Sequence, residues 1–249
     1  MENNIKLSLV IPAYNEVDNL KKDVLDQVEE YLKKQNYLFE VVIVDDGSKD
    51  ETVKIIKEQI KDKKHFRLIE NPHGGKAITV MTGMIESKGE VAVFTDMDQA
   101  TPIKELEKIL SKFEEGYDVV IGSRSGRKGA PLLRKLMALG FALLRNVMLG
   151  LPLKDTQCGF KGFNRKSING VFPDMLVIWK KMRSQNAAVN AGFDVETLFL
   201  AKKRGFKIAE EIVEWHYVGT QRVQAISDSI EAIKDMLRIR LNDLQGKYN

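Results

Sequence analysis

Short apolar runs alternate with segments of helical spacing along the first half of the chain. Five compact apolar runs, typical of buried strands, occupy residues 7–11, 39–44, 66–69, 91–94 and 119–121. Apolar residues at helical spacing occupy the intervening ranges 20–32, 52–60, 77–85 and 103–113. Repeated β-α units of this kind predict an α/β fold with a mostly parallel, doubly wound sheet flanked by helices.

The second half is less regular. Residues 123–131 are rich in Gly, Ser, Arg and Lys and predict a loop, and residues 132–151 predict a strongly apolar helix. Residues 172–191 give a mixed signal that fits a helix, a flap or an inserted loop. The last segment carries six aliphatic side chains at helical spacing, which predicts a C-terminal amphipathic helix. They are Ile226, Ile230, Ile233, Leu237, Leu241 and Leu244.

Composition narrows the class of protein. With 249 residues, 43% hydrophobic and 30% charged, the chain can bury a large core in one domain or two small ones. A net charge of +4 is too small to imply a nucleic-acid partner. Cys158 is the only cysteine, so no intrachain disulfide is possible, and a reducing compartment is expected. With no signal-peptide shape and no apolar run of spanning length, we expect a cytoplasmic protein, at most peripheral on the cytoplasmic face of a membrane.

Two carboxylate pairs close two of the predicted strands. Asp45 and Asp46 follow the run 39–44, and Asp96 and Asp98 follow the run 91–94. Parallel strands deliver such residues to the carboxyl edge of the sheet, where open α/β folds bind their ligands. Alternate residues of an extended chain point the same way, so Asp96 and Asp98 can converge on one cation. Acids at strand ends also fill turns and cap helices, but two pairs favour a nucleotide with Mg²⁺ or Mn²⁺.

Basic residues occur at two informative places. Gly74-Gly75-Lys76 precedes a predicted helix, where it forms either an anion site or a plain helix-start turn. Arg124, Arg127, Lys128 and Arg134 cluster where a strand ends and the apolar helix begins. Such a charge run is commonly just a solvated face, although this arrangement also suits an acceptor with an anionic head and an apolar tail. The helix itself fits a membrane interface, a buried core or a dimer contact.

Six short motifs follow one another in a recognisable order. They are Ile11-Pro-Ala-Tyr-Asn-Glu16, Val44-Asp-Asp-Gly-Ser48, Phe94-Thr-Asp-Met-Asp98, Gly122-Ser-Arg124, Asp155-Thr-Gln-Cys-Gly-Phe-Lys161 and Gly192-Phe-Asp-Val-Glu196. Together they resemble the GT-A fold of the family 2 inverting glycosyltransferases and cover roughly residues 7–222. The run from Asp155 to Lys161 is most similar to the polyprenyl-phosphate (dolichyl-phosphate) sugar transferases, in particular the glucosyl branch.

The resemblance implies one GT-A domain over residues 1–249 with a Rossmann-like sheet. Its nucleotide-sugar half would span about residues 1–122 and its acceptor half about residues 123–249. Tyr14 would stack on the base, and Asp46 or Asp45 would accept a hydrogen bond from the base ring. The residues implied to bind the nucleotide sugar are Pro12, Tyr14, Glu16, Asp45, Asp46, Lys76, Asp96 and Arg222.

The resemblance also implies a metal site. Asp96 and Asp98 match the metal motif of the family, with Asp98 as the direct ligand. Related mannosyltransferases place a Gln shortly after this motif as a further ligand, which makes Gln99 a candidate. The implied cofactor is Mg²⁺ or Mn²⁺, which would neutralise charge on the departing nucleoside diphosphate.

Acceptor residues follow from the same comparison. Arg124 and Arg134 match positions that hold the lipid phosphate, a task suited to the forked donors of arginine. Asp155 stands where some members place an acid near the acceptor, so the catalytic candidates are Asp98, Asp155 and Arg124. Asp194 and Glu196 are a second acidic group, or helix N-terminal acids.

These residues predict inverting transfer of a hexose, glucose from UDP-glucose, to a polyprenyl phosphate. Three alternatives stay open: transfer to a hydroxyl of a glycan or cell-envelope polymer, GDP-mannose-dependent mannosyl transfer, and non-catalytic nucleotide-sugar binding. The expected partners are a UDP-hexose and a polyprenyl-phosphate lipid at the membrane surface, with a homo-oligomer or a membrane partner protein also open. A Rossmann dehydrogenase is disfavoured because no Gly-x-Gly-x-x-Gly follows the first strand.

Overall fold

The computed structural model describes residues 4–124, 132–183, 192–216 and 225–248. In this part of the chain seven strands form one sheet in the order β3-β2-β1-β4-β6-β5-β7. The strands are β1 (Leu7–Ala13), β2 (Phe39–Asp45), β3 (Phe66–Glu70), β4 (Val91–Phe94), β5 (Val119–Ser123), β6 (Lys161–Asn164) and β7 (Ile208–Ile212). Neighbouring strands are parallel except that β6 runs antiparallel to both β4 and β5. The predicted mostly parallel α/β sheet is therefore confirmed.

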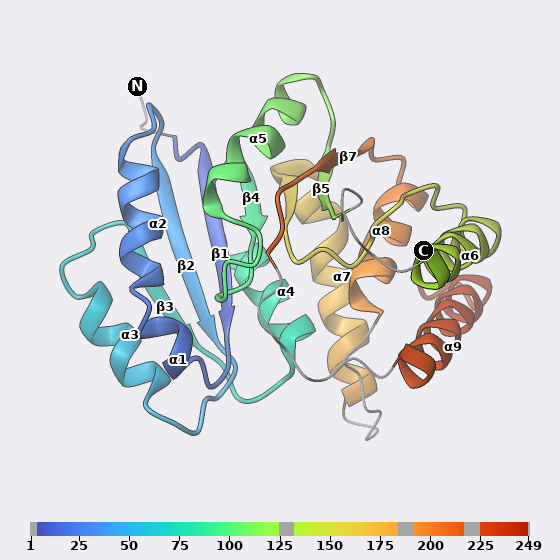
Figure 1. The fold of residues 1–249 in the computed structure, drawn as a ribbon, viewed down its shortest axis with the longest axis horizontal. Helices are drawn as coiled ribbons and strands as arrows, with labels where there is room; N and C mark the ends of the chain where they lie inside the picture. The colour runs from blue at the N-terminus through green and yellow to red at the C-terminus, as the bar shows by residue number, and fades with distance from the viewer. Residues whose placement is uncertain (1–3, 125–131, 184–191, 217–224, 249) are drawn as a thin grey trace.

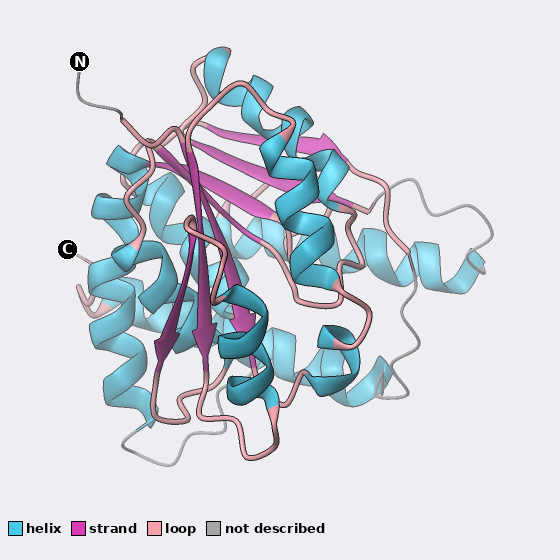
Figure 2. Cartoon of the chain, turned by 90° about the vertical axis from the view of Figure 1, so that its left-hand side faces the viewer, coloured by secondary structure: helices cyan, strands magenta, loops and turns pink. Residues whose placement is uncertain are grey.

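Helices cover both faces of the twisted sheet, as Figure 2 shows from the side. The helices of the first half are α1 (Val17–Leu20), α2 (Val24–Lys33), α3 (Thr52–Ile60), α4 (Lys76–Glu86), the 3₁₀ turn η1 (Ile103–Glu105) and α5 (Leu106–Glu114). The predicted helix over 20–32 is divided, because Asp23 takes a left-handed conformation with φ of 56° between α1 and α2. Those of the second half are α6 (Leu132–Leu149), α7 (Arg165–Arg183), α8 (Phe193–Lys203) and α9 (Ala225–Leu244).

The strands alternate their side chains between two hydrophobic layers. Val10 and Val42 pack on one face, in a layer shared with α4, α7 and α8. Leu9 and Val41 pack on the other face with α1, α2, α3 and α5. Because successive residues of a strand point to opposite faces, strands covered on both sides read as continuous apolar runs in the sequence.

Parallel pairing places the carboxyl ends of β1, β2 and β4 along one edge of the sheet, at the bottom of Figure 1. The helices α6 and α9 pack together at the side of the molecule away from α2 and α3 (Figure 1). Both agree with the predicted apolar helix and the predicted C-terminal helix.

The ambiguous segment 172–191 is helical over the residues that the structure describes. The helix α7 continues to Arg183 and contains Pro173, and residues 184–191 lie outside the described residues. Among the helices described, none combines the length and the apolar content needed to cross a bilayer.

Candidate active site

The loops at the carboxyl edge are tied to one another by side chains. Asn15, which follows β1 with a left-handed φ of 56°, accepts a hydrogen bond from the backbone N–H of Lys49 at 2.9 Å. Its own N–H donates to Ser48 Oγ at 2.9 Å. The next N–H, that of Glu16, donates to Thr52 Oγ1 at 2.7 Å. These bonds hold the turn after β1 against the turn after β2.

The two acids of the first pair have different surroundings. Asp45 folds back on its own turn and accepts bonds from the N–H groups of Gly47 at 2.9 Å and Ser48 at 3.0 Å. Both its oxygens serve the turn, since Ser48 Oγ also donates to Asp45 Oδ1. Asp45 therefore braces the loop, while Asp46 is the acid that reaches across the edge.

Asp46 binds backbone N–H groups at the start of α4. Its carboxylate accepts bonds from the N–H groups of Gly74 at 2.6 Å and Gly75 at 2.9 Å, and His73 Nδ1 lies 2.9 Å from Oδ2. Residues 74–76 thus form a helix-start turn whose free N–H groups meet a carboxylate of the protein itself.

An aromatic pair lies beside this turn. The ring of His73 stacks on Tyr14 with centroids 4.6 Å apart, and Tyr14 is partly exposed to solvent. Pro12, in contrast, is buried within β1. These contacts of His73 were not predicted, because no pattern in the sequence indicates a partner 59 positions away in the chain.

The second carboxylate pair lies beside Lys76 and Glu16. Lys76 Nζ is 2.5 Å from Asp96 Oδ1, and Asp98 Oδ1 accepts the N–H of Ala100 at 2.9 Å. Burial raises the pKa of Glu16, and the negative charges of Asp98 and Asp96 raise it further against the opposing bond from Asn19. Glu16, Asp96 and Asp98 therefore form one group of mutually repelling acids at the carboxyl edge.

Gln99 bears two signs of a ligand position. It adopts a left-handed backbone with φ of 49°, and its Nε2 donates to the carbonyl of Asp96 at 3.0 Å. Its Oε1 is buried and has no hydrogen-bond partner among the described residues. The amide oxygen is therefore available beside Asp96 and Asp98.

These three side chains offer oxygen atoms only, the type of ligand that Mg²⁺ and Mn²⁺ prefer. No group of three or more His, Cys, Asp or Glu residues suited to a metal occurs in the described residues. A cation that takes further oxygens from a substrate diphosphate needs no such cage. Asp96, Asp98 and Gln99 fit such a metal.

Across the site, Arg124 and Asp155 form a two-pronged ion pair. Arg124 Nε and Nη2 lie 2.6 and 2.8 Å from the Asp155 oxygens, and the backbone N–H of Arg124 adds a third bond. Burial alone would raise the pKa of Asp155, but the bonds and charge of Arg124 outweigh it and lower this pKa to about 2. The guanidinium also lies over the ring of Trp215, 5.7 Å from its centroid.

The side chains of two implied site residues lie outside the part of the chain that the structure describes. Arg134 lies in the first turn of α6, and its side chain lies outside the described residues. Arg222 falls in the range 217–224, which also lies outside them. Their implied roles stay predictions.

A second ion pair, not predicted from the sequence, lies near the acids. Lys161 is 1% exposed, and its Nζ lies 2.5 Å from Asp194 Oδ1 and donates to the carbonyl of Cys158. The ammonium also lies 5.3 Å from the ring centroid of Phe94. The only sequence signal was the position of Lys161 at the end of the Asp155–Lys161 motif.

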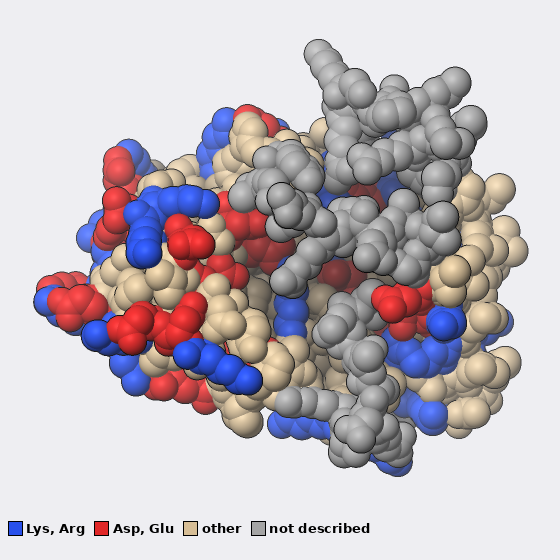
Figure 3. Space-filling model, turned by 60° about the horizontal axis from the view of Figure 1, so that its bottom comes forward, with Lys and Arg blue, Asp and Glu red and all other residues tan. Residues whose placement is uncertain are grey.

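Gly159 brings this motif against the metal candidates. A methyl group built on Gly159 would lie 2.7 Å from Asp96 Cγ and 3.1 Å from Oδ1. The segment 155–161 therefore contacts Arg124 through its first residue, Asp96 through Gly159 and Asp194 through Lys161. Figure 3 views the molecule from this side and shows acidic and basic side chains around a hollow.

Glu196, the second acid in the first turn of α8, has a structural role. Its carboxylate is completely buried and accepts bonds from Trp179 Nε1 at 3.0 Å, from Arg238 at 2.8 Å and from the hydroxyl of Tyr248. It joins α7, α9 and the C-terminal segment, so it does not belong with Asp194 at the site.

Comparison with protein families and with curated proteins gives consistent matches. The model of the family described as "Glycosyl transferase family 2" matches residues 8–172. A dolichyl-phosphate beta-glucosyltransferase of Dictyostelium discoideum is 33% identical, over 98% of this chain and 76% of that protein. The protein of the same description from Saccharomyces cerevisiae is 33% identical, over 99% of this chain and 78% of that protein.

Solved structures show a similar fold. Mannosyl-3-phosphoglycerate synthase from Rubrobacter xylanophilus matches with a TM-score of 0.63 and 14% identity, over 98% of this chain and 75% of that one. Glucosyl-3-phosphoglycerate synthase from Mycobacterium tuberculosis, in complex with Mn²⁺, UDP and glucosyl-3-phosphoglycerate, matches with a TM-score of 0.61 and 17% identity. This second match covers 94% of the present chain and 80% of the other.

Proposed function

This chain belongs to glycosyl transferase family 2, and from that premise we propose that it transfers glucose from UDP-glucose to a dolichyl or other polyprenyl phosphate. Membership and the glucosyltransferase relatives make it a glycosyltransferase. The donor, the acceptor and the roles of individual residues are the proposal. The description of the curated relatives supports the glucosyl group and the dolichyl-phosphate acceptor.

The bidentate ion pair of Asp155 with Arg124 is the structural observation that carries the choice of acceptor. A sugar hydroxyl must lose a proton to attack, so it needs a base whose pKa lies near the working pH. With a pKa of about 2 and a bidentate bond to Arg124, Asp155 is a poor base at neutral pH. A phosphate monoester arrives already ionised and needs no base, which supports a lipid phosphate over a hydroxyl.

Arg124 is the cation that would meet this acceptor. Two of its nitrogens are held by Asp155, whereas Nη1 makes no hydrogen bond within the described residues. Asp155 therefore fixes the plane of the guanidinium and leaves one side of it for a phosphate. In this proposal Asp155 positions Arg124, and Arg124 is the residue that touches the acceptor.

On the donor side, the aromatic pair of Tyr14 and His73 offers a stacking surface for the base. Lys76 would bind the diphosphate from its position beside Asp96. A Mg²⁺ or Mn²⁺ ion held by Asp96, Asp98 and Gln99 would offset the negative charge that gathers on the leaving diphosphate. A neighbour of similar fold is in complex with Mn²⁺ and UDP, which supports a divalent metal and a uridine diphosphate as the ligands.

The reaction is a single displacement at C1 of the sugar. An oxygen of the acceptor phosphate forms a bond to C1 while the bond from C1 to the donor diphosphate breaks, and its electron pair leaves with UDP. Attack from the opposite side inverts the configuration at C1. The protein contributes mainly position and charge, through Arg124 on one side and Lys76 on the other. We propose that this takes place at the cytoplasmic face of a membrane.

Partitioning of radiolabelled product tests the proposal. The purified chain is incubated with Mn²⁺, UDP-[¹⁴C]glucose or GDP-[¹⁴C]mannose, and either a polyprenyl phosphate or the same polyprenol without phosphate. We expect label in the organic phase only with UDP-glucose and the phosphorylated lipid. Label that enters the organic phase only with GDP-mannose would refute the donor, and equal transfer to the free polyprenol would refute the acceptor.

A further inference from the structure

The helix α9 has two opposite apolar faces, and only one of them is used inside the protein. Met236 and Ile239 are buried against the core, on the side of the helix from which Arg238 reaches Glu196. Opposite to them lies a row of five aliphatic side chains with exposed fractions from 38% to 72%. They are Ile230, Ile233, Leu237, Leu241 and Leu244. At 3.6 residues per turn they span a sector of about 80° over about 21 Å of helix.

The neighbouring helix also exposes large apolar side chains. In α6, which packs beside α9, Leu143 is 65% exposed and Val147 is 75% exposed. We call these two residues and the row of five on α9 the α6–α9 face. Large exposed apolar side chains on two helices that pack together mark a place of contact with another molecule or with a membrane.

Charge along α9 favours one kind of contact. Lys234 lies next to the apolar row on the helix surface, and no described residue pairs with it. Arg240 flanks the other side of the row. The acids Asp235 and Asp243 are turned toward the packed side, where Asp235 pairs with Arg238 and Asp243 pairs with Lys203 and Arg240. The exposed Glu231 lies farther round the helix from the row than Lys234 does. The apolar row is therefore bordered by Lys234, a cation without a partner among the described residues, and by Arg240, whose charge is shared with Asp243.

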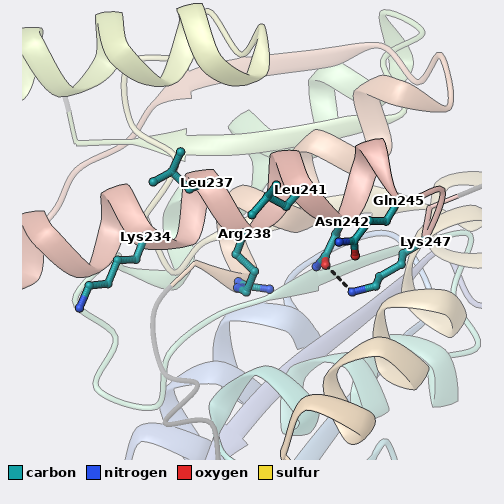
Figure 4. Close-up of a pocket in the computed structure, with 7 residues that line it drawn as sticks. All are labelled: Lys234, Leu237, Arg238, Leu241, Asn242, Gln245 and Lys247. Carbon is teal, nitrogen blue, oxygen red and sulfur yellow. Dashed lines mark hydrogen bonds between the residues drawn. The ribbon is translucent and has the colours of Figure 1, made fainter.

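A shallow pocket of about 370 Å³ lies along the same helix (Figure 4). Leu237 and Leu241 extend to one side of α9 and Lys234 and Arg238 to the other, and Lys247 follows from the next turn. No carboxylate is among the residues that line it. Apolar and cationic linings side by side suit an anionic amphiphile, whose acyl chains and headgroup make the two kinds of contact.

We propose that the α6–α9 face docks this protein on an anionic lipid bilayer. The inference deepens the proposed function and rests on it, because an acceptor that is a lipid phosphate lies in such a surface. Lys234 would contact the headgroups while the aliphatic row enters the interface. The helix α6 begins after the loop that follows Arg124, so the same contact would bring the acceptor side of the site to the membrane.

Vesicle cosedimentation tests the docking without donor or acceptor. Wild-type protein is mixed with vesicles of phosphatidylcholine alone or of phosphatidylcholine with phosphatidylglycerol. We expect binding to the anionic vesicles, at least tenfold weaker for the triple variant Leu237→Gln/Leu241→Gln/Leu244→Gln. Lys234→Gln should weaken binding to anionic vesicles about fivefold at low salt and leave weak binding to neutral vesicles unchanged.

The matched control is Leu38→Gln, a similarly exposed aliphatic residue before β2, on the side of the molecule away from α9. It should bind vesicles as the wild type does. Equal binding by the wild type and the triple variant would overturn the proposal. So would a wild-type dimer in light scattering that the triple variant converts to monomer with unchanged vesicle binding, since the face would then join two copies.

A second measurement separates this inference from the proposed function. Transfer of glucose to a short-chain polyprenyl phosphate dispersed in detergent should be equal for the wild type and the triple variant. Transfer to a long-chain acceptor embedded in anionic vesicles should fall with the vesicle binding. Absence of transfer by the wild type in detergent would refute the proposed function and leave the docking result to stand by itself.

Discussion

A single methyl group at Gly159 should disable the site without unfolding the protein. An alanine side chain at this position would lie 2.7 Å from Asp96 Cγ, whereas two carbon atoms pack best at about 3.5–4.0 Å. Asp96 Oδ2 would be closer still, so the carboxylate must retreat from residue 159 by roughly 1 Å, which changes its position relative to Asp98 and Gln99. Because only the end of one side chain has to move, the fold should survive the change.

The magnitude follows from that displacement. A misplacement of about 1 Å in a catalytic arrangement costs about a hundredfold in rate, which corresponds to about 2.7 kcal/mol of transition-state free energy. We expect kcat/KM of Gly159→Ala for UDP-glucose to fall by about this factor, with a higher concentration of Mn²⁺ needed for half-maximal rate. The melting temperature should change by only a few degrees.

The control is Gly140→Ala in α6, where an added methyl group meets no atom within 4 Å. It should leave the rate unchanged and, as an alanine in a helix, slightly stabilise the protein. A Gly159→Ala enzyme with a rate within threefold of the wild type and the same Mn²⁺ dependence would refute the reasoning. It would show that the position of Asp96 does not matter to the reaction.

Three further predictions concern other parts of the structure. Asp98→Ala should abolish the extra thermal stabilisation that Mn²⁺ gives to the UDP complex in a melting assay, and a retained metal effect would contradict its role as ligand. Glu196→Gln should lower the free energy of unfolding in urea by about 3 kcal/mol, because it removes the completely buried charge of a network and leaves the partly buried Arg238 with Asp235 alone. Asp174→Asn, which breaks an exposed pair, should cost less than about 1 kcal/mol, and equal losses would contradict the assigned importance of Glu196. The lowered pKa of Asp155 means that its ion pair is complete above the ordinary carboxyl pKa and is lost only as the pH falls toward about 2. Between pH 5 and 8 Asp155 should therefore contribute no limb to the profile of kcat/KM, whereas the acceptor phosphate titrates near about pH 6, and a limb that disappears in Asp155→Asn would disprove this.

The pattern of strand and helix signals along the sequence predicted most of the fold. Runs such as 39–44 are apolar on both faces because helices cover both sides of the sheet, so their hydrophobicity alone predicts buried parallel strands. The reversed direction of β6 was not predictable in the same way. It depends on pairing with β4 and β5, which are separated from it along the chain, and no local pattern records strand direction.

The sequence predicted which residues lie at the site better than it predicted their hydrogen-bond and ion-pair partners. Asp96 and Asp98 stand at the end of β4, where a short local motif fixes their position. The roles of Asp45 and Asp46 differ because one folds on its own turn and the other meets Gly74, and these two arrangements look alike in sequence. The pairing of Lys161 with Asp194 joins positions 33 residues apart, and no pattern in the sequence indicates that these two residues meet.

The interlocked turns at the carboxyl edge have a consequence for how this enzyme can diversify. Asn15, Ser48 and Asp46 join the loops after β1, β2 and β3 to one another, so bonds within the protein hold this corner together. None of these hydrogen bonds involves a residue after Gly75. A chimera that joins this N-terminal portion to the later portion of a relative should therefore inherit its nucleotide preference from the first parent and its acceptor from the second.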